Sequence, residues 1–303
     1  MSPFIVSLPV FLIIAIGWLF KKYRIVNEVW VHILNSFAYY VSLPALIVVS
    51  FWGVDFLSSD VQLIVRASIL LTVIFSGIVL LALSLAPFSK KLKVALFLVA
   101  TTGNTVYMGF PILSNALGDV SLRLGTVVAV VYLVVPILLS IFVIRWWIGK
   151  DHSLAHQLGG FIKNPLVLSI IAGIGISFIP KHWVIMQVIG DGLSMLALTA
   201  SPVALFVLGA FLYKRFLRRH VGLVIGISVI KVAMFPALVW LLMGFDSFPL
   251  IAPILFLLAA MPAAVTTFVI AEQFDLDAGF VGNVLLVSTV LSFFAIPLAV
   301  SLL

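Results

Sequence analysis

Ten runs of apolar residues follow one another along almost the whole chain, and this succession constrains the fold more than any other feature. Charged and turn-forming residues separate the runs, which fall at approximately 3–20, 30–52, 62–86, 94–117, 122–148, 165–180, 186–213, 221–244, 250–273 and 278–302. A helix needs about 20 apolar residues to cross the roughly 30 Å hydrocarbon core of a bilayer. The pattern therefore predicts an all-α polytopic membrane protein with ten transmembrane helices.

The composition agrees with this and leaves little room for a domain outside the membrane. Of the 303 residues, 64% are hydrophobic and 9% are charged, whereas a soluble chain has about 25% charged residues. No cysteine is present, which excludes disulfides, thiolate metal sites and cysteine nucleophiles. Walker A, HExxH and GxSxG patterns are also missing from the sequence. We expect no enzyme, no cofactor and no metal site, and a net charge of +7 that reflects membrane topology rather than a nucleic-acid partner.

Lysine and arginine gather in alternate connections between the runs. The first, third, fifth and seventh connections hold 13 of the 17 cations, namely Lys21, Lys22, Arg24, Lys90, Lys91, Lys93, Arg145, Lys150, Lys163, Lys214, Arg215, Arg218 and Arg219. Cytoplasmic loops carry such an excess of positive charge. We therefore expect a multi-pass protein of the cytoplasmic (inner) cell membrane, with the odd connections inside and both termini outside.

Three sequence landmarks recur at nearly one spacing. The segments 96–100 and 255–259, Pro44 and Pro202, and Pro136 and Pro297 are 159, 158 and 161 residues apart. This spacing contains five helices, an odd number, so a second copy of the unit must enter the membrane with the opposite orientation. The sequence predicts a 5+5 inverted repeat with a first half at 1–148, a cytoplasmic connection at 149–164 and a second half at 165–303.

Helix-breaking residues lie near the middle of the fourth and ninth runs. The fourth run reads ATTGNTVYMGFP over 100–111, and the ninth reads AMPAAVTT over 260–267. Proline removes a backbone hydrogen bond and glycine weakens a helix, so we expect both helices to be interrupted. Backbone groups freed in this way must face a protein-lined, wet cavity, which is where inverted-repeat transporters bind their substrates.

Such breaks supply polarity without an ionised side chain. A half-helix that begins in the membrane presents free N–H groups and a partial positive charge, which together suit a carboxylate. The candidate substrate-binding residues at the breaks are Thr102, Gly103, Asn104, Thr105, Pro111, Pro262, Ala263 and Thr266. The alternative is structural: Gly and Pro are common in membrane helices, and these Thr hydroxyls then bond to their own or a neighbouring helix.

Lys231 is a further candidate for substrate binding. It lies about ten residues into the eighth run, roughly 15 Å from the start of that run at 1.5 Å per residue. Placing a cation at such depth costs free energy, so a residue of this kind is a candidate for a function. No carboxylate lies equally deep, since Asp191 and Glu272 are close to the ends of their runs. Lys231 is expected either to bind an anionic substrate or to rest against carbonyl groups at helix C-termini, and a purely structural lysine is the alternative.

Other polar residues have simpler interpretations. Arg66 is expected to reach the membrane interface from near the end of its run. His152 and His156 have the i,i+4 spacing of a metal site but no third ligand, so we expect a solvated loop. An acidic cluster is interpreted as a solvated turn, with proton or cation coupling as the alternative; it consists of Glu272, Asp275 and Asp277.

Short motifs spread over the whole chain match those of one transporter family in the same order. They are Gly103-Asn104-Thr105 with Met108 to Pro111, Asn164-Pro165, Ser201 to Gly209, Lys231 to Pro236, Met261-Pro262-Ala263, Ala271, and Ser288-Thr289 to Ile296-Pro297. By these motifs the chain resembles the auxin efflux carrier family, which includes plant auxin exporters and bacterial malonate-type carriers. The long hydrophilic loop of the plant members is missing between 145 and 164, which favours a prokaryotic carrier.

The resemblance implies a fold related to bile-acid sodium symporters and sodium/proton antiporters, in which the fourth and ninth helices cross at their breaks. It implies a dimerising scaffold of helices 1, 2, 6 and 7, and a transport unit of helices 3–5 and 8–10 that moves as an elevator. The implied crossing residues are Gly103, Asn104, Thr105, Pro111, Pro262 and Ala263, with Asn104 at the substrate carboxylate.

These observations together predict a secondary active transporter or facilitator of a small organic anion. We expect a carboxylate substrate, elevator-type alternating access, a homodimer in the lipid bilayer and optional proton coupling. Two alternatives stay open. One is a cation- or proton-coupled antiporter or symporter of the related type, and the other is a non-transporting membrane receptor.

Overall fold

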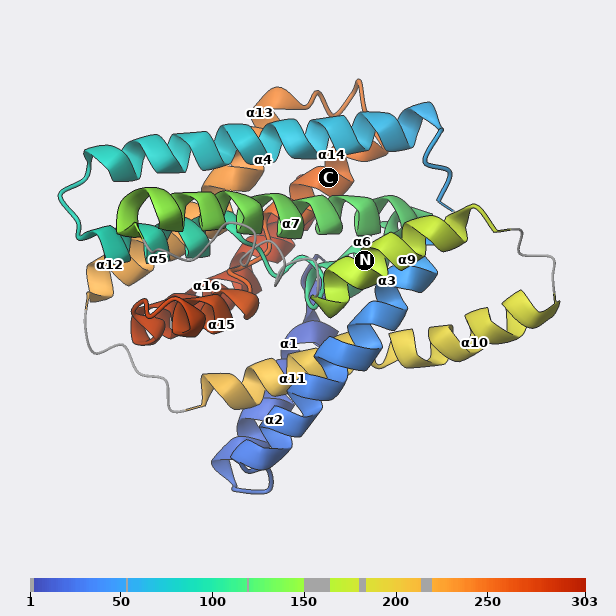
Figure 1. Ribbon diagram of the computed structural model, residues 1–303, viewed down its shortest axis with the longest axis horizontal. Helices are drawn as coiled ribbons and strands as arrows, with labels where there is room; N and C mark the ends of the chain where they lie inside the picture. The colour runs from blue at the N-terminus through green and yellow to red at the C-terminus, as the bar shows by residue number, and fades with distance from the viewer. Residues whose placement is uncertain (1–2, 53, 119, 150–163, 180–183, 214–219) are drawn as a thin grey trace.

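The computed structural model describes residues 3–52, 54–118, 120–149, 164–179, 184–213 and 220–303, and its regular elements there are helices (Figure 1). The first half contains α1 (Pro3–Lys22), α2 (Glu28–Phe37), η1 (Ala38–Ser42), α3 (Leu43–Phe51), α4 (Ser59–Leu85), α5 (Lys90–Thr101), α6 (Gly109–Leu117) and α7 (Val120–Ile148). The predicted all-helical class is confirmed for these ranges. Several residues singled out above lie outside them, namely Lys150, His152, His156, Lys163, Lys214, Arg215, Arg218 and Arg219.

The second half continues in the same style. It contains α9 (Pro165–Ser177), α10 (Val184–Leu198), α11 (Ala200–Leu212), α12 (Val221–Val229), η2 (Ile230–Met234), α13 (Phe235–Leu242), α14 (Ile251–Ala259), α15 (Thr266–Gln273) and α16 (Ala278–Ser301). Asn164 begins α9 because its side chain accepts a hydrogen bond from the N–H of Leu166 at 2.9 Å, and Pro165 fits the first helical position.

Seven helical segments in the described ranges are long and apolar enough to cross a membrane. They are Pro3–Lys22, Glu28–Phe51, Ser59–Leu85, Ser121–Ile148, Val184–Leu212, Val221–Leu242 and Ala278–Ser301. The predicted runs at 94–117, 165–180 and 250–273 form shorter helices instead. These seven segments support a multi-pass membrane protein.

The fourth and ninth runs are interrupted, as their glycine and proline residues predict. The first interruption separates α5 from α6 over residues 102–108, and the second separates α14 from α15 over residues 260–265. Pro9, Pro136 and Pro297 behave differently, because they lie inside the continuous helices α1, α7 and α16. Proline alone therefore does not break a helix here.

Two of the long segments contain a π-helical turn that the apolar pattern does not reveal. The turn η1 joins α2 to α3, and η2 joins α12 to α13. A π-turn adds one residue to the helix and shifts the direction of the side chains around it, often at a functional site. The turn η2 contains Lys231.

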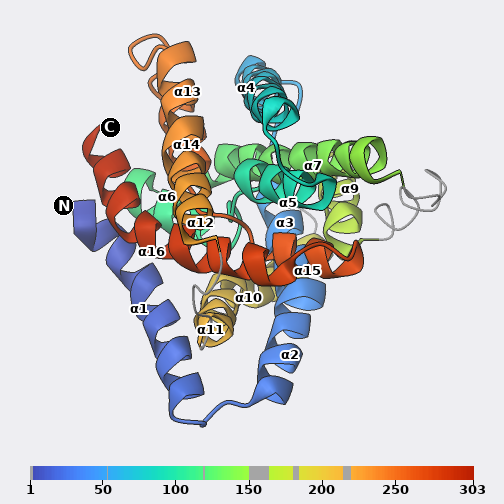
Figure 2. The same ribbon diagram turned by 90° about the vertical axis from the view of Figure 1, so that its left-hand side faces the viewer.

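The helices form two groups that meet along α1–α16 and α3–α7. In the first helix group, α1 packs along α11, α3 packs against both α9 and α10, and α2 follows α1 through a short turn. Figure 2 shows α1 and α2 as the two arms of a V with α10 and α11 between them. The second helix group comprises α4 to α7 and α12 to α16, among which α4 packs on α7 and α12 packs on α16.

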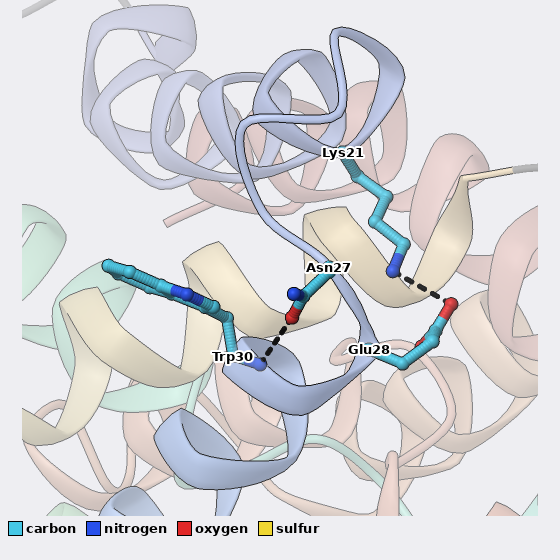
Figure 3. A network of polar contacts seen from close by, with 4 residues as sticks. All are labelled: Lys21, Asn27, Glu28 and Trp30. Atoms are coloured by element: carbon cyan, nitrogen blue, oxygen red, sulfur yellow. Dashed lines mark hydrogen bonds and ion pairs between the residues drawn. The ribbon is translucent and has the colours of Figure 1, made fainter.

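The turn between α1 and α2 is fixed by side chains from both of its ends (Figure 3). Asn27 accepts a hydrogen bond from the N–H of Trp30 at 3.0 Å and so caps α2. Lys21 Nζ lies 2.7 Å from Glu28 Oε1. This arrangement turns the chain back immediately after the cation-rich end of α1.

The acidic cluster predicted near the end of the ninth run lies on the surface. Asp275 Oδ2 is 2.6 Å from Lys91 Nζ, in an ion pair between the loop after α15 and the start of α5. Asp277 caps α16 by accepting the N–H of Phe280 at 2.8 Å. Glu272 is exposed. Two members of the cluster thus have structural roles, in agreement with the interpretation as a solvated turn.

Candidate functional site

The two interrupted helices cross and exchange two backbone hydrogen bonds. The N–H of Asn104 donates to the carbonyl of Pro262 at 2.8 Å, and the N–H of Ala264 donates to the carbonyl of Thr102 at 3.1 Å. Backbone groups cannot stay unpaired in a bilayer core, so each interruption supplies the partners that the other one needs. Each interrupted segment therefore depends on the other for its backbone hydrogen bonds.

Small residues permit this close approach. Gly103 and Ala263 face each other as an isolated antiparallel β-bridge at the crossing. The N–H of Ala263 turns toward α16 and donates to Ser288 Oγ at 3.2 Å. A Cβ atom on Gly109 would lie only 2.6 Å from Leu258 Cδ2, so α6 and α14 pass closely at this glycine. The crossing is thereby fixed to both neighbouring helices.

Three buried polar atoms at the crossing have no hydrogen-bond partner within the described ranges. They are Asn104 Nδ2, Thr102 Oγ1 and Thr266 Oγ1. Leaving such an atom unpaired costs about 1–3 kcal/mol, and folded proteins contain few of them. Thr105 differs, because its hydroxyl donates to the carbonyl of Ala129 on α7 at 3.2 Å. The other three hydrogen-bonding groups at the crossing therefore remain unpaired in the described ranges.

A small pocket of about 20 Å³ lies at this point. Its wall consists of Gly103, Asn104, Thr105, Val106 and Tyr107 from one break, Ala264, Val265 and Thr266 from the other, and Leu43, Ile47, Leu133 and Leu166 from neighbouring helices. This volume is about that of a single water molecule. The unpartnered amide of Asn104 is thus on a residue of the pocket wall.

A larger cavity of about 690 Å³ adjoins the small pocket. The two share Tyr107, Leu133, Leu166, Val265 and Thr266. The polar residues that complete the larger wall are His32, Asn35, Ser36, Tyr39, Tyr40, Ser140, Asn164 and Gln273. Pockets for small molecules typically measure about 300–1,000 Å³. Among the residues that line these two cavities there is no Asp, Glu, Lys or Arg.

The N-terminus of α15 contributes donors to both cavities. Val265 and Thr266 line both of them, and their backbone N–H groups have no acceptor in the part of the chain that the structure describes. The next two N–H groups are taken, since Thr267 donates to Ala264 and Phe268 donates to Val265. Free N–H groups and the helix dipole make this end of α15 suitable for negative charge.

Lys231 lies beside the crossing but lines neither cavity. Its side chain is 1% exposed, and it forms no ion pair or hydrogen bond in the described ranges. A Cβ atom on Gly103 would lie 3.1 Å from its Nζ atom, so the ammonium group packs directly against this glycine. The ring centroid of Phe235, one helical turn further on, is 5.6 Å from Nζ.

The structure separates the nine predicted site residues into three sets. Four line a cavity: Gly103, Asn104, Thr105 and Thr266. Three others belong to the crossing behind it: Thr102, Pro262 and Ala263. Pro111 lies within α6 and Lys231 within η2, and neither lines a described cavity.

Sequence reasoning missed one side of the cavity. Tyr107 lies in the same break as Asn104, and Asn164 precedes a proline, so both carried a local signal. Tyr39 carried no such signal in the sequence, because it reaches the cavity from the π-turn η1. Its position depends on how α2 packs, which a single sequence does not reveal.

Comparison with known proteins identifies the family. The sequence profile of a family described as "Membrane transport protein" matches residues 4–157 and 152–300. The chain belongs to this family, that of the auxin efflux carriers. An uncharacterized transporter of Methanocaldococcus jannaschii, MJ1031, is 25% identical over 304 residues, which cover 98% of each chain. The resemblance seen in the motifs is confirmed, and the protein is a multi-pass membrane transporter.

Membership of this transporter family gives the crossing a context. Residues of both interrupted helices line the small pocket. Two of them carry side-chain donors without a partner in the described ranges, Asn104 Nδ2 and Thr266 Oγ1. In a membrane transport protein, such a place is suited to hold the transported molecule.

Proposed function

We propose that the protein carries a small organic anion with a carboxylate group across the membrane, as a secondary active transporter or facilitator. One observation carries this proposal: several hydrogen-bond donors around the small pocket have no partner in the described ranges. They are the amide of Asn104, the hydroxyl of Thr266 and the N–H groups of Val265 and Thr266. A carboxylate accepts several hydrogen bonds and fits such a set.

The absence of Asp, Glu, Lys and Arg from the walls of the two described cavities also favours a reversible anion carrier. Neutral donors and a helix N-terminus hold a carboxylate without the strong pairing that an arginine would give. The wall is otherwise formed by apolar and aromatic side chains such as Leu133, Leu166 and Tyr107. We therefore propose Asn104, Thr266, Gly103 and Thr105 as substrate-contacting residues. Thr102, Pro262 and Ala263 are proposed to support them through the crossing, and Pro111 to shape α6.

Elevator-type alternating access is part of the proposal. The larger cavity lies between the two helix groups: Tyr39 and Asn164 come from the first group, and Tyr107 and Thr266 from the second. Sliding of one group past the other would carry the crossing toward the opposite side. We assign predicted helices 1, 2, 6 and 7 to the scaffold and helices 3–5 and 8–10 to the moving unit.

We further propose that these groups arise from ten membrane-spanning segments in a 5+5 inverted repeat, with halves at 1–148 and 165–303. The packing of α1 on α11 and of α9 on α3 supports this, because helix 1 then packs on helix 7 as helix 6 packs on helix 2, which is the exchange of halves that the repeat predicts. Glycines contact the partner helix in both pairs, Gly17 at Phe206 and Gly173 at Phe51. Gly17 and Gly173 are 156 residues apart, close to the spacing of the sequence landmarks.

The charge distribution supports an orientation in the membrane. The larger cavity is lined by His32, Asn164 and Gln273, which lie near the ends of helices that meet the odd connections. With those connections inside, the cavity faces the cytoplasm and both termini face outward. We place the protein in the cytoplasmic membrane and propose a homodimer formed through the scaffold, whose helices α2 and α10 expose apolar side chains such as Trp30 and Val188.

The two alternatives receive less support. A cation or proton exchanger needs a buried carboxylate at its site, and the residues that line the described cavities include none. Proton coupling of anion transport stays a secondary element of the proposal. A receptor without transport has no need for a cavity between two helix groups that ends at crossed helix breaks.

Transport in proteoliposomes tests the proposal. We would measure uptake of labelled acetate, butyrate, benzoate, indole-3-acetate, malonate and succinate by the purified protein. At least one is expected to be taken up, and Asn104→Ala is expected to lower that uptake about tenfold, the loss of one hydrogen bond to a charged group. Asn115→Ala is the matched control, because Asn115 donates to the carbonyl of Val6 on α1, away from the cavities. Unchanged uptake in Asn104→Ala would contradict the proposed site.

A further inference from the structure

Lys231 is the most deeply placed charge in the second helix group. Every other charged residue in the helices of this group lies within seven positions of a helix end, whereas Lys231 is ten positions from the start of α12 and eleven from the end of α13. Its side chain is 1% exposed. A cation at this depth requires a function or a partner.

No acidic side chain neutralises Lys231 in the described ranges. The two ion pairs found there, Lys21 with Glu28 and Lys91 with Asp275, lie on the surface. The helices packed against η2 are α5, α12, α13 and α16, and none of them contains an Asp or Glu. The protonated amine of Lys231 therefore has no carboxylate counterion in the described ranges.

The position of Lys231 ties this charge to the proposed substrate site. Its Nζ atom packs on Gly103, with 3.1 Å to the point where a Cβ atom would lie. The same stretch of backbone lines the small pocket through Gly103 and Asn104. Gly103 therefore contacts the ammonium group and also lines the pocket. Coulomb attraction over such a distance is strong where little water screens it.

From this placement we propose that Lys231 is the fixed countercharge of the transported anion and that it moves with the anion across the membrane. This inference rests on the proposed carboxylate carrier. Lys231 acts through the crossing without touching the substrate, so it is a positioning residue. With a monocarboxylate bound at the pocket, the negative charge of the substrate cancels the buried positive charge of Lys231. The buried part of the loaded unit then crosses the membrane without net charge.

A fixed countercharge predicts how transport depends on the membrane potential, whereas a merely structural lysine makes no such prediction. The membrane potential does work only on net charge that moves through it. When labelled monocarboxylate exchanges for unlabelled monocarboxylate, the moving unit crosses the membrane only with substrate bound. The rate of this exchange should therefore not respond to the membrane potential. A dicarboxylate leaves one negative charge uncompensated, and its exchange should respond.

The experiment is exchange across proteoliposomes with a potassium–valinomycin potential of either sign. The probes are the monocarboxylate and the dicarboxylate of the panel that the wild type exchanges fastest. Imposing the potential should change monocarboxylate exchange by less than about twofold and dicarboxylate exchange by about fivefold or more. In Lys231→Met, monocarboxylate exchange should become voltage-dependent by about fivefold or more. Lys231→Arg, which keeps the charge, should behave like the wild type.

Lys91→Met is the matched control, because it removes the same charge from an exposed surface position. Equal voltage dependence of monocarboxylate and dicarboxylate exchange in the wild type would overturn the inference, and this comparison needs no variant to fold. Monocarboxylate exchange that stays insensitive in Lys231→Met would overturn it as well. If the wild type exchanges no carboxylate at all, the proposed function fails instead, which is a separate result.

Discussion

The hydroxyl oxygens of Ser42 and Thr199 lie 2.7 Å apart and join the π-turn η1 to the junction of α10 and α11. Thr199 donates its own proton to the carbonyl of Leu196 at 2.6 Å. Ser42 must therefore be the donor to Thr199, since each hydroxyl has one proton. The two residues are 157 positions apart, nearly the spacing of the proposed repeat. In the proposed repeat, this bond joins equivalent helices of the two halves.

The direction of this hydrogen bond predicts unequal effects of the two single substitutions. Ser42→Ala leaves Thr199 paired with Leu196 and should cost about 0.6 kcal/mol, a typical value between membrane helices. Thr199→Val leaves the fully buried Ser42 hydroxyl without its acceptor and should cost about 1–3 kcal/mol. Thermal unfolding in detergent, followed by tryptophan fluorescence, measures both. Equal effects of the two substitutions would contradict the assigned direction.

The contact between α1 and α11 predicts that Gly209 cannot be enlarged. A Cβ atom there would lie 1.9 Å from the carbonyl oxygen of Ile14. Gly209→Ala should therefore separate the two helices and destabilise the protein by about 1–3 kcal/mol. The control is Gly77→Ala in α4, where no atom lies within 4 Å of the added methyl group. This control should be neutral or stabilising by up to about 1 kcal/mol, because alanine favours a helix. A melting temperature lowered equally by both substitutions would show that the α1–α11 contact is not the cause.

The helix breaks could be predicted from the sequence because their cause is local. Gly103 and Pro262 weaken a helix wherever it lies, and they occupy corresponding positions in the proposed repeat. The charge of Lys231 and its depth were also evident from the sequence alone. The family resemblance added the expectation that the two breaks cross.

Other features of the site depend on packing between distant segments. The π-turns η1 and η2 contain no residue type that marks them, so the direction of Tyr39 into the cavity was not predictable. Lys231 was expected either to bind the substrate or to rest against carbonyl groups, and its contact with Gly103 could not be predicted, because it depends on how η2 packs against α5 and α16. Pro111 was grouped with the crossing by its motif, yet it lies within α6 and lines neither described cavity.

Thr266 and Thr267 provide a test in which stability and binding should change in opposite directions. Thr266 Oγ1 is buried without a partner, whereas Thr267 Oγ1 donates to the carbonyl of Ala264 at 2.6 Å. Thr266→Val removes an unsatisfied polar atom and should raise the free energy of unfolding by about 1 kcal/mol. It also removes a proposed donor to the carboxylate and should weaken carboxylate binding about tenfold.

The neighbouring substitution is the control for this test. Thr267→Val should lower stability by about 0.5–1.5 kcal/mol, the usual worth of a hydrogen bond, and leave carboxylate affinity unchanged. Thermal shift of the purified variants, with and without the best carboxylate of the panel, measures both quantities. If Thr266→Val binds the carboxylate as tightly as the wild type, its hydroxyl is not part of the site.

The orientation of the cavity can be tested directly because the chain contains no cysteine. A single cysteine therefore reports its own position without a background of other thiols. Gln273→Cys places a thiol in the wall of the larger cavity, near the connection assigned to the cytoplasm. Leu57→Cys places one at an exposed position in the second connection, which is assigned to the outside. A membrane-impermeant maleimide added to intact cells should label the cysteine at 57 and spare the one at 273. Inverted vesicles should give the reverse, and labelling of the cysteine at 273 in intact cells would contradict the orientation deduced from the lysine and arginine distribution.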